Sequence, residues 1–260
     1  MNLSLAASVV NRLEYVETTG STNTDVATAA TASPAEWPDL SVLCASSQTA
    51  GRGRSGREWQ SNANASLAAS ILVRPAGVDI KHFGWLPILA GLAMSRTVAE
   101  FLPNHDVALK WPNDVLVNDK KISGVLSELL PSGGAVVIGA GLNLAQAQHE
   151  LPIEAATSLA IEGVEVSFET ALENYLKNFV ALYKPYVEHG GNADASGLRA
   201  QATAGCGTIG RKVRAMMPGD QVVEGNAIDL DTSGRLLIAV AGQEQFYAVA
   251  AGDIVHLRHN

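Results

Sequence analysis

Two long stretches of the chain repeat apolar residues at the spacing of an amphipathic helix. Between residues 79 and 102 apolar side chains recur about every three or four positions, and Pro103 ends the pattern. A second such face, at 167–187, is formed by Phe168, Leu172, Tyr175, Leu176, Phe179 and Tyr183. Shorter helices are expected at 24–30, after the cap-forming residues Ser21 and Thr22, and at 195–203.

Short apolar runs separated by turn residues indicate strands. In the first 150 residues they fall at 13–16, 40–45, 67–73, 107–110, 115–117, 121–128 and 135–138. The segment 31–39, which holds two prolines, is expected to be a loop. This part of the chain therefore mixes helices with short strands.

The pattern changes near residue 207, where we place a domain boundary. Short strands are expected after it at 213–217, 221–230, 235–240, 245–249 and 254–258. Five short strands in about 50 residues suggest a small barrel rather than an extension of the first sheet. We therefore predict a large domain at 1–207 and a small β domain at 208–260.

Composition narrows the possible functions. Hydrophobic residues make up 47% of the 260, enough for a sizeable core. The formal net charge of −8 argues against a general attraction to nucleic acid, so clustered basic groups are expected to serve one local anion. The two cysteines and six scattered histidines form no zinc motif. Because no apolar run reaches membrane-spanning length, we expect a cytoplasmic protein without membrane contact.

The segment from Gln48 to Arg57 is rich in glycine and arginine. Its glycine spacing matches a dinucleotide-binding fingerprint, but that fingerprint requires an apolar helix to follow, and the next residues are polar. The Gly-Lys-Ser/Thr ending of a Walker loop is also missing. The residues instead suit a flexible loop whose backbone amides and three arginines (52, 54 and 57) approach an anion. A solvated basic loop is the alternative at this point.

Two further segments carry candidate chemistry. Residues 110–117 read Lys-Trp-Pro-Asn-Asp-Val-Leu-Val and lead to Lys121 and to Gly124, a glycine within a strand pattern that suggests close approach of a ligand. Residues 138–144 place two glycines at an expected strand end, before Asn143, whose amide could read the edge of a base. Taken singly, the first segment also fits an ordinary hairpin and the second a plain turn.

Together these segments closely resemble the biotin–protein ligase family. The shared motifs are, in order, Gly-Ser-Thr-Asn at 20–23, the glycine- and arginine-rich loop, Lys-Trp-Pro-Asn-Asp, Lys-Ile-Ser-Gly at 121–124 and Gly-Ala-Gly-Leu-Asn at 139–143. The resemblance implies an α/β (α+β) fold: a mixed, largely antiparallel sheet flanked by helices, akin to class II aminoacyl-tRNA synthetases, with an SH3-like C-terminal barrel. It also implies synthesis of biotinoyl-AMP from biotin and ATP, and transfer of the biotin to a lysine of a carboxyl carrier domain.

The resemblance assigns expected roles to individual residues. The expected biotin contacts are Ser21, Thr22, Gln48, Gly51, Arg52, Lys121, Gly124 and Gly139. The expected ATP contacts are Arg52, Arg54, Arg57, Trp59, Asn113, Lys121 and Asn143. Asp114, together with Asn113 beside it, is expected to hold Mg²⁺ with the phosphates. The expected catalytic residues are Lys121, Arg52 and Arg54, because fixed positive charge stabilises the anionic transition state.

The sequence also bears on three alternatives to a monofunctional biotin–protein ligase. Family members that also repress transcription carry a DNA-binding domain ahead of the Ser-Thr-Asn motif. Only about 20 residues precede the motif here, so we expect a monofunctional enzyme that binds no nucleic acid. A lipoate–protein ligase would share fold and chemistry, but its Arg-Arg-x-x-Gly-Gly-Gly loop is absent. A non-catalytic biotin- or nucleotide-binding regulator would be expected to lose Lys121 or the loop arginines, which are present.

Overall fold

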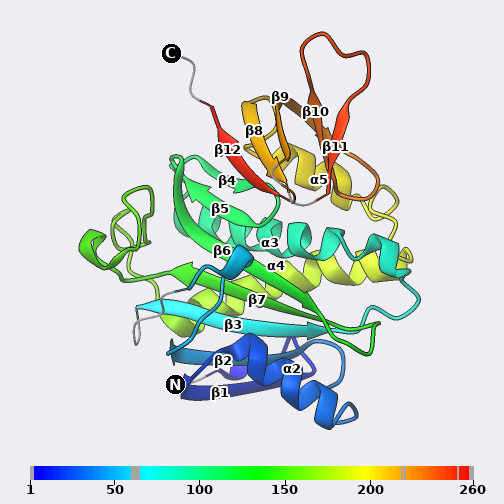
Figure 1. Ribbon diagram of the computed structural model, residues 1–260. Coiled ribbons are helices and arrows are strands. Elements are labelled where there is room, and N and C mark those ends of the chain that lie inside the picture. Colours follow the sequence, from blue (N-terminus) through cyan, green and yellow to red (C-terminus); the bar gives the residue numbers. More distant parts are fainter. Residues whose placement is uncertain (1–2, 60–64, 218, 220, 251, 258–260) are drawn as a thin grey trace.

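A seven-stranded sheet forms the centre of the protein (Figure 1). The computed structural model describes residues 3–257 apart from 60–64, 218, 220 and 251. In spatial order the strands are β1 (Arg12–Thr19), β2 (Ser41–Gln48), β3 (Ser66–Val73), β7 (Val136–Asn143), β6 (Lys120–Leu129), β5 (Asp114–Val117) and β4 (Val107–Lys110). Only the β1–β2 pair among these is parallel. The expected mixed, largely antiparallel sheet is therefore confirmed.

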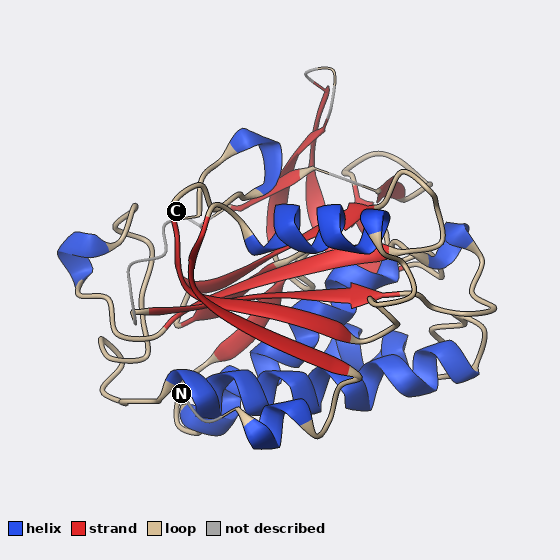
Figure 2. Cartoon of the chain, turned by 90° about the horizontal axis from the view of Figure 1, so that it is seen from below, coloured by secondary structure: helices blue, strands red, loops and turns tan. Residues whose placement is uncertain are grey.

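Helices cover both faces of this sheet (Figure 2). The two long helices α3 (Trp85–Phe101) and α4 (Phe168–Glu188) pack together on one face, where the main apolar core lies. Helix α2 (Thr22–Ala32) packs on β2, β3 and β7 over a smaller core. All six apolar residues predicted for one face of α4 are buried. The short helix α1 (Ser4–Ala7), which the sequence pattern did not indicate, packs against α4.

The prediction of a continuous helix over 79–102 is wrong for its first residues. The structure forms a separate 3-10 turn, η2 (Ile80–His82), and α3 begins only at Trp85. The carboxylate of Asp79 accepts a hydrogen bond of 3.0 Å from the backbone N–H of Lys81, which caps the short turn. Ile80, expected on the apolar face, is 57% exposed. The last strand of the large sheet also continues past the expected end at residue 138, to Asn143.

The C-terminal strands form a second, entirely antiparallel sheet. Its order is β11 (Tyr247–Val249), β10 (Leu236–Ala239), β9 (Gln221–Leu230), β8 (Lys212–Met217) and β12 (Asp253–His256), and it follows helix α5 (Leu198–Gly205). The separate sheet was predicted. Its closure into a barrel stays a prediction, because no pairing between the end strands β11 and β12 occurs among the described residues.

Two buried indoles of the large domain donate hydrogen bonds to the second sheet. The Nε1–H of Trp85 donates to the carbonyl oxygen of Thr232, and that of Trp111 to the carbonyl oxygen of Gly234, both at 2.9 Å. Both acceptors lie in the turn between β9 and β10. Residues of β12 line the pocket described below. None of the helices in the described part of the chain is long and apolar enough to cross a membrane.

Candidate active site

A pocket of about 1190 Å³ lies where the start of α2, strands β5 to β7, the glycine-rich loop and β12 meet. Most of the predicted site residues line it, namely Ser21, Thr22, Gln48, Arg54, Arg57, Trp59, Asn113, Asp114, Lys121, Gly124, Gly139 and Asn143. Gly51 and Arg52 do not line it. They lie in a neighbouring hollow behind the loop, together with Glu128.

One end of the pocket is polar and uncharged. Thr22 donates to the side-chain oxygen of Gln48 twice, from its backbone nitrogen at 2.9 Å and from its hydroxyl at 3.0 Å. Ser21 is the N-cap of α2, as predicted, but its hydroxyl makes no capping hydrogen bond. Ser21 and Thr22 are both at most 5% exposed. This end can therefore offer neutral donors and acceptors to a buried polar ligand group.

Lys121 lines the pocket and pairs with Asp114 at 2.7 Å. Its backbone is fixed by a segment that sequence reasoning missed, since its N–H donates to Ala155 at 2.8 Å and its carbonyl accepts from Thr157 at 2.9 Å. A Cβ at Gly124 would lie only 3.2 Å from the Lys121 Nζ. The glycine therefore leaves room for the lysine to lie across β6, and it also lines the pocket.

The second sheet holds two of the loop arginines in place. Arg54 donates to the side-chain oxygen of Asn113 at 2.7 Å and to the carbonyl of Gly252 at 3.0 Å. Arg57 forms an ion pair with Asp253 at the start of β12. Sequence reasoning missed Gly252 and Asp253, because no motif marks them and they lie almost 200 residues away along the chain.

The amides of Asn113 and Asn143 are used within the protein. Asn113 donates to the carbonyl of Val125 at 2.6 Å while its oxygen accepts from Arg54. Asn143 donates to the carbonyl of Thr157 at 2.9 Å, and its oxygen lies 3.3 Å from the donor nitrogen of Gln146. In this structure both residues position neighbouring parts of the site. Their expected contacts with ATP stay predictions.

The indole of Trp59 fills the space above a glycine of β7. A Cβ at Gly141 would lie 2.2 Å from the Trp59 Cε2, and a Cβ at Gly139 would lie 2.2 Å from the side-chain oxygen of Asn23. The prediction that these two glycines lie at a strand end is wrong, since both lie within β7. These positions are glycine because side chains from α2 and the loop occupy the space that a Cβ would need. The Trp59 Nε1–H is buried and has no partner among the described residues.

Basic groups gather at the end of the pocket formed by the loop and β12. Lys110 lies there, and its burial lowers its pKa, an effect that the nearby Asp114 opposes and Lys121 reinforces. Burial also lowers the pKa of His256 on β12 to about 4, with Lys110 and Arg211 adding to the shift. An anion bound at this end would compensate the cost of burying the Lys110 ammonium group.

The metal-binding capacity of the pocket is small. Among residues 3–257 without the undescribed positions, no group of three or more histidine, cysteine, aspartate or glutamate side chains could hold a metal ion. Asp114, the predicted metal ligand, offers one carboxylate, which is already paired with Lys121. Any divalent ion here would need most of its ligands from a bound molecule.

Comparison with known proteins identifies the family. The model of the biotin/lipoate A/B protein ligase family matches residues 15–143, and that of the biotin protein ligase C-terminal domain matches 208–257. The chain is 40% identical over 255 residues to biotin--[acetyl-CoA-carboxylase] ligase of Mycobacterium tuberculosis, which spans 97% of this chain and 92% of that relative. The chain belongs to the biotin protein ligase family.

Other biotin protein ligases are similar to this chain over most of its length. The bifunctional ligase/repressor BirA of Bacillus spizizenii is 30% identical over 224 residues, which are 84% of this chain and 66% of that one. The structure of the biotin protein ligase from Aquifex aeolicus in complex with biotin and ATP superposes with a TM-score of 0.76 at 27% identity. That match covers 96% of this chain and all of the Aquifex chain. The likeness thus includes both sheets.

Proposed function

We propose that this chain condenses biotin with ATP to biotinoyl-5′-AMP and diphosphate, and then transfers the biotin to a lysine of a carrier domain in a biotin-dependent carboxylase. One observation carries the proposal: a single pocket is lined by a group of neutral polar side chains, by Lys121 and by a group of lysine and arginine side chains. That arrangement is complementary to a neutral ureido ring at one end and a phosphate chain at the other. The Mycobacterium relative, named for acetyl-CoA carboxylase, and the Aquifex complex with biotin and ATP support it.

The neutral end of the pocket suits the ureido ring of biotin. Ser21, Thr22 and Gln48 supply two hydroxyls and an amide, which can satisfy the donors and the acceptor of the ring without burying a charge. The backbone at Gly51 and the side chain of Arg52 would join this end once the loop moves towards it. Gly124 and Gly139 line the wall along which the aliphatic chain would lie.

Lys121 is positioned to act between the biotin carboxylate and the α-phosphate. The two reacting groups are anions that repel each other, and the ammonium group lowers that repulsion. As the carboxylate oxygen attacks the phosphorus and diphosphate leaves in line, the same charge stabilises the transition state. Arg54 and Arg57, now bound to Gly252 and Asp253, would exchange these partners for phosphate oxygens.

The nucleotide base is proposed to lie beside the Trp59 indole, with Asn143 near its edge. Mg²⁺ fits the site if Asp114 supplies one carboxylate oxygen and the phosphates supply the rest, and it would neutralise phosphate charge. Asn113 does not fit as a ligand in the present arrangement, because its amide holds Arg54 and Val125.

The C-terminal domain is proposed to begin at residue 208 and to form an SH3-like barrel, on a catalytic domain akin to class II aminoacyl-tRNA synthetases. Through β12 it would cover the phosphates and help to dock the carrier domain, a role supported by its contacts with Arg54 and Arg57. A cytoplasmic location is proposed because Cys44 and Cys206 are buried and form no disulfide, which suits a reducing compartment.

The adenylation half of the proposed reaction can be tested without a carrier. The protein is incubated with ATP, Mg²⁺ and biotin, and diphosphate and biotinoyl-AMP are quantified, with lipoate replacing biotin as a control. We expect one burst of diphosphate that requires biotin and does not occur with lipoate. If diphosphate is released with lipoate but not with biotin, the chain is a lipoate ligase. If biotin causes no release of diphosphate, the proposal is contradicted.

A further inference from the structure

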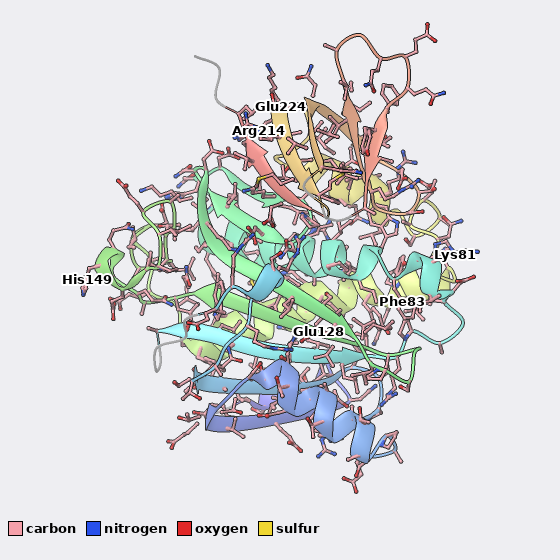
Figure 3. All side chains as sticks on the ribbon, viewed as in Figure 1. Lys81, Phe83, Glu128, His149, Arg214 and Glu224 are labelled. Carbon is pink, nitrogen blue, oxygen red and sulfur yellow. The ribbon has the colours of Figure 1, made fainter. Side chains whose placement is uncertain are left out.

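Glu128 near the end of β6 joins two parts of the site that no single motif connects. Its carboxylate accepts a hydrogen bond of 2.9 Å from the side-chain amide of Asn23 in α2 and forms an ion pair with Arg52 of the glycine-rich loop. Both donors meet the same oxygen, Oε2. Figure 3 shows Glu128 near the middle of the molecule. The residue lines the hollow behind the loop, of about 510 Å³, and not the main pocket.

From Asn23 a chain of buried polar groups leads to the neutral end of the pocket. The hydroxyl of Ser70 lies 2.6 Å from the side-chain oxygen of Asn23 and 2.7 Å from the hydroxyl of Thr22, which in turn donates to Gln48. Asn23 and Ser70 are at most 4% exposed. A hydroxyl has one proton, so Ser70 can donate to only one of its two neighbours at a time.

This arrangement ties the orientation of Asn23 to what occupies the neutral end. A ligand N–H that donates to Thr22 makes that hydroxyl a poorer acceptor for Ser70, whose proton then turns to the oxygen of Asn23. The Asn23 nitrogen, which also donates to the carbonyl of Leu126 at 3.2 Å, is thereby directed to Glu128. Asn23 cannot easily move away, because it fills the space left by Gly139, where a Cβ would lie 2.2 Å from its oxygen. A ligand at the neutral end therefore strengthens the hydrogen bond from Asn23 to the Glu128 carboxylate.

We propose that Glu128 is a positioning residue that couples occupation of the biotin end of the pocket to the position of Arg52, and so to closure of the glycine-rich loop. The inference rests on the proposed function and deepens it. The Arg52 side chain is 48% exposed and that of Glu128 is 34% exposed. Such exposed pairs contribute little to stability. The pair can therefore exchange partners when a ligand arrives, and a substitution at Glu128 should leave the fold intact.

The test compares Glu128→Gln with a matched control, Glu224→Gln. Glu224 pairs with Arg214 on the C-terminal sheet, and their side chains are 43% and 49% exposed (Figure 3). Both variants lose one carboxylate from an exposed ion pair and keep the amide shape. Biotin affinity is measured by titration without ATP. Loop protection is measured as the rate of tryptic cleavage after Arg52, Arg54 and Arg57, with and without biotin.

We expect biotin to slow cleavage in the wild type and in Glu224→Gln. In Glu128→Gln the biotin affinity should fall about tenfold, the effect of losing one charge-assisted hydrogen bond. Biotin should also protect the loop less, even at saturation. If Glu128 had only a structural role, its substitution would change the melting temperature and not the protection of the loop by biotin. In a double-mutant cycle, Glu128→Gln should add little to the loss of biotin affinity caused by Arg52→Gln, because Glu128 acts on the biotin end only through Arg52.

Two outcomes overturn the inference, and they are distinguishable. If the wild type binds biotin and Glu128→Gln matches Glu224→Gln in affinity and protection, Glu128 does not couple the two parts and the proposed function stands. If the wild type binds no biotin at any concentration tested, the proposed function fails and the coupling with it.

Discussion

Adding a single methyl group at Gly141 should specifically disturb the nucleotide end of the pocket. A Cβ there would lie 2.2 Å from Cε2, 2.4 Å from Cζ2 and 2.6 Å from Nε1 of Trp59. Since carbon atoms in contact are about 3.5–4.0 Å apart, the indole must move by about 1.5 Å. The Trp59 backbone cannot simply retreat with the ring, because its N–H donates to Gly51 at 2.9 Å and its carbonyl lies against that glycine. The ring must leave its place.

The expected size of the effect follows from this clash. Overpacking of a filled site costs about 1–3 kcal/mol. If that cost falls on nucleotide binding, the KM for ATP in Gly141→Ala should rise about 5- to 150-fold. The neutral end does not contact Gly141, so biotin affinity should change far less. The assay is biotin-dependent diphosphate release at saturating biotin over a range of ATP concentrations.

Two controls make the result specific to Trp59. Gly20→Ala adds the same methyl where nothing lies within 4 Å, and it should behave like the wild type. Combining Gly141→Ala with Trp59→Ala should be no worse than Trp59→Ala alone, because removal of the indole removes the clash. If Gly141→Ala folds and its KM for ATP equals that of the wild type, Trp59 does not contact the nucleotide and the proposed orientation of ATP is wrong.

Three further predictions concern the lysine, the domain contact and pH. Lys121→Ala should slow diphosphate release about 100-fold or more while leaving the melting temperature nearly unchanged; near wild-type release would contradict the role of Lys121. Trp111→Phe leaves the Gly234 carbonyl without its donor, so thermal unfolding should show a loss of about 2 kcal/mol and a Tm lower by roughly 4–8 °C. Burial lowers the pKa of His256 to about 4, so the unfolded chain binds more protons between its ordinary value of about 6.5 and 4. The contribution of neutral His256 to the free energy of unfolding is therefore fully present above about pH 6.5 and is lost as the pH falls to 4. Between these pH values the Tm of His256→Gln should fall less than the Tm of the wild type. An identical fall in both proteins would refute this prediction.

Local features of the sequence were sufficient for much of the fold and for part of the site. Most of the strands and α4 follow from residue periodicity. Ser21 and Thr22 lie at a helix start, as their residue types predict, although the Ser21 hydroxyl makes no capping hydrogen bond. Lys121 lies in the pocket because it begins a strand that lines it. In these cases the deciding interactions join residues that are close along the chain.

The remaining features depend on contacts that no local pattern encodes. Asp253 reaches Arg57 only because the second sheet packs beside the pocket. The glycines of β7 looked like turn residues, since the side chains that need their space come from α2 and the loop. Asn113 was expected to face ATP, but its amide is taken up by Val125 on the neighbouring strand and by Arg54. Such partners become visible only once the sheet has formed.

Transfer of biotin to a carrier domain tests the central claim most directly. The protein is incubated with ATP, Mg²⁺, biotin and an apo carrier fragment, and the fragment is analysed by intact mass and peptide mapping. The account predicts a single biotinoyl increment on one lysine, which requires both ATP and biotin and is lost with Lys121→Ala. No increment on a fragment that another biotin protein ligase does modify would contradict it.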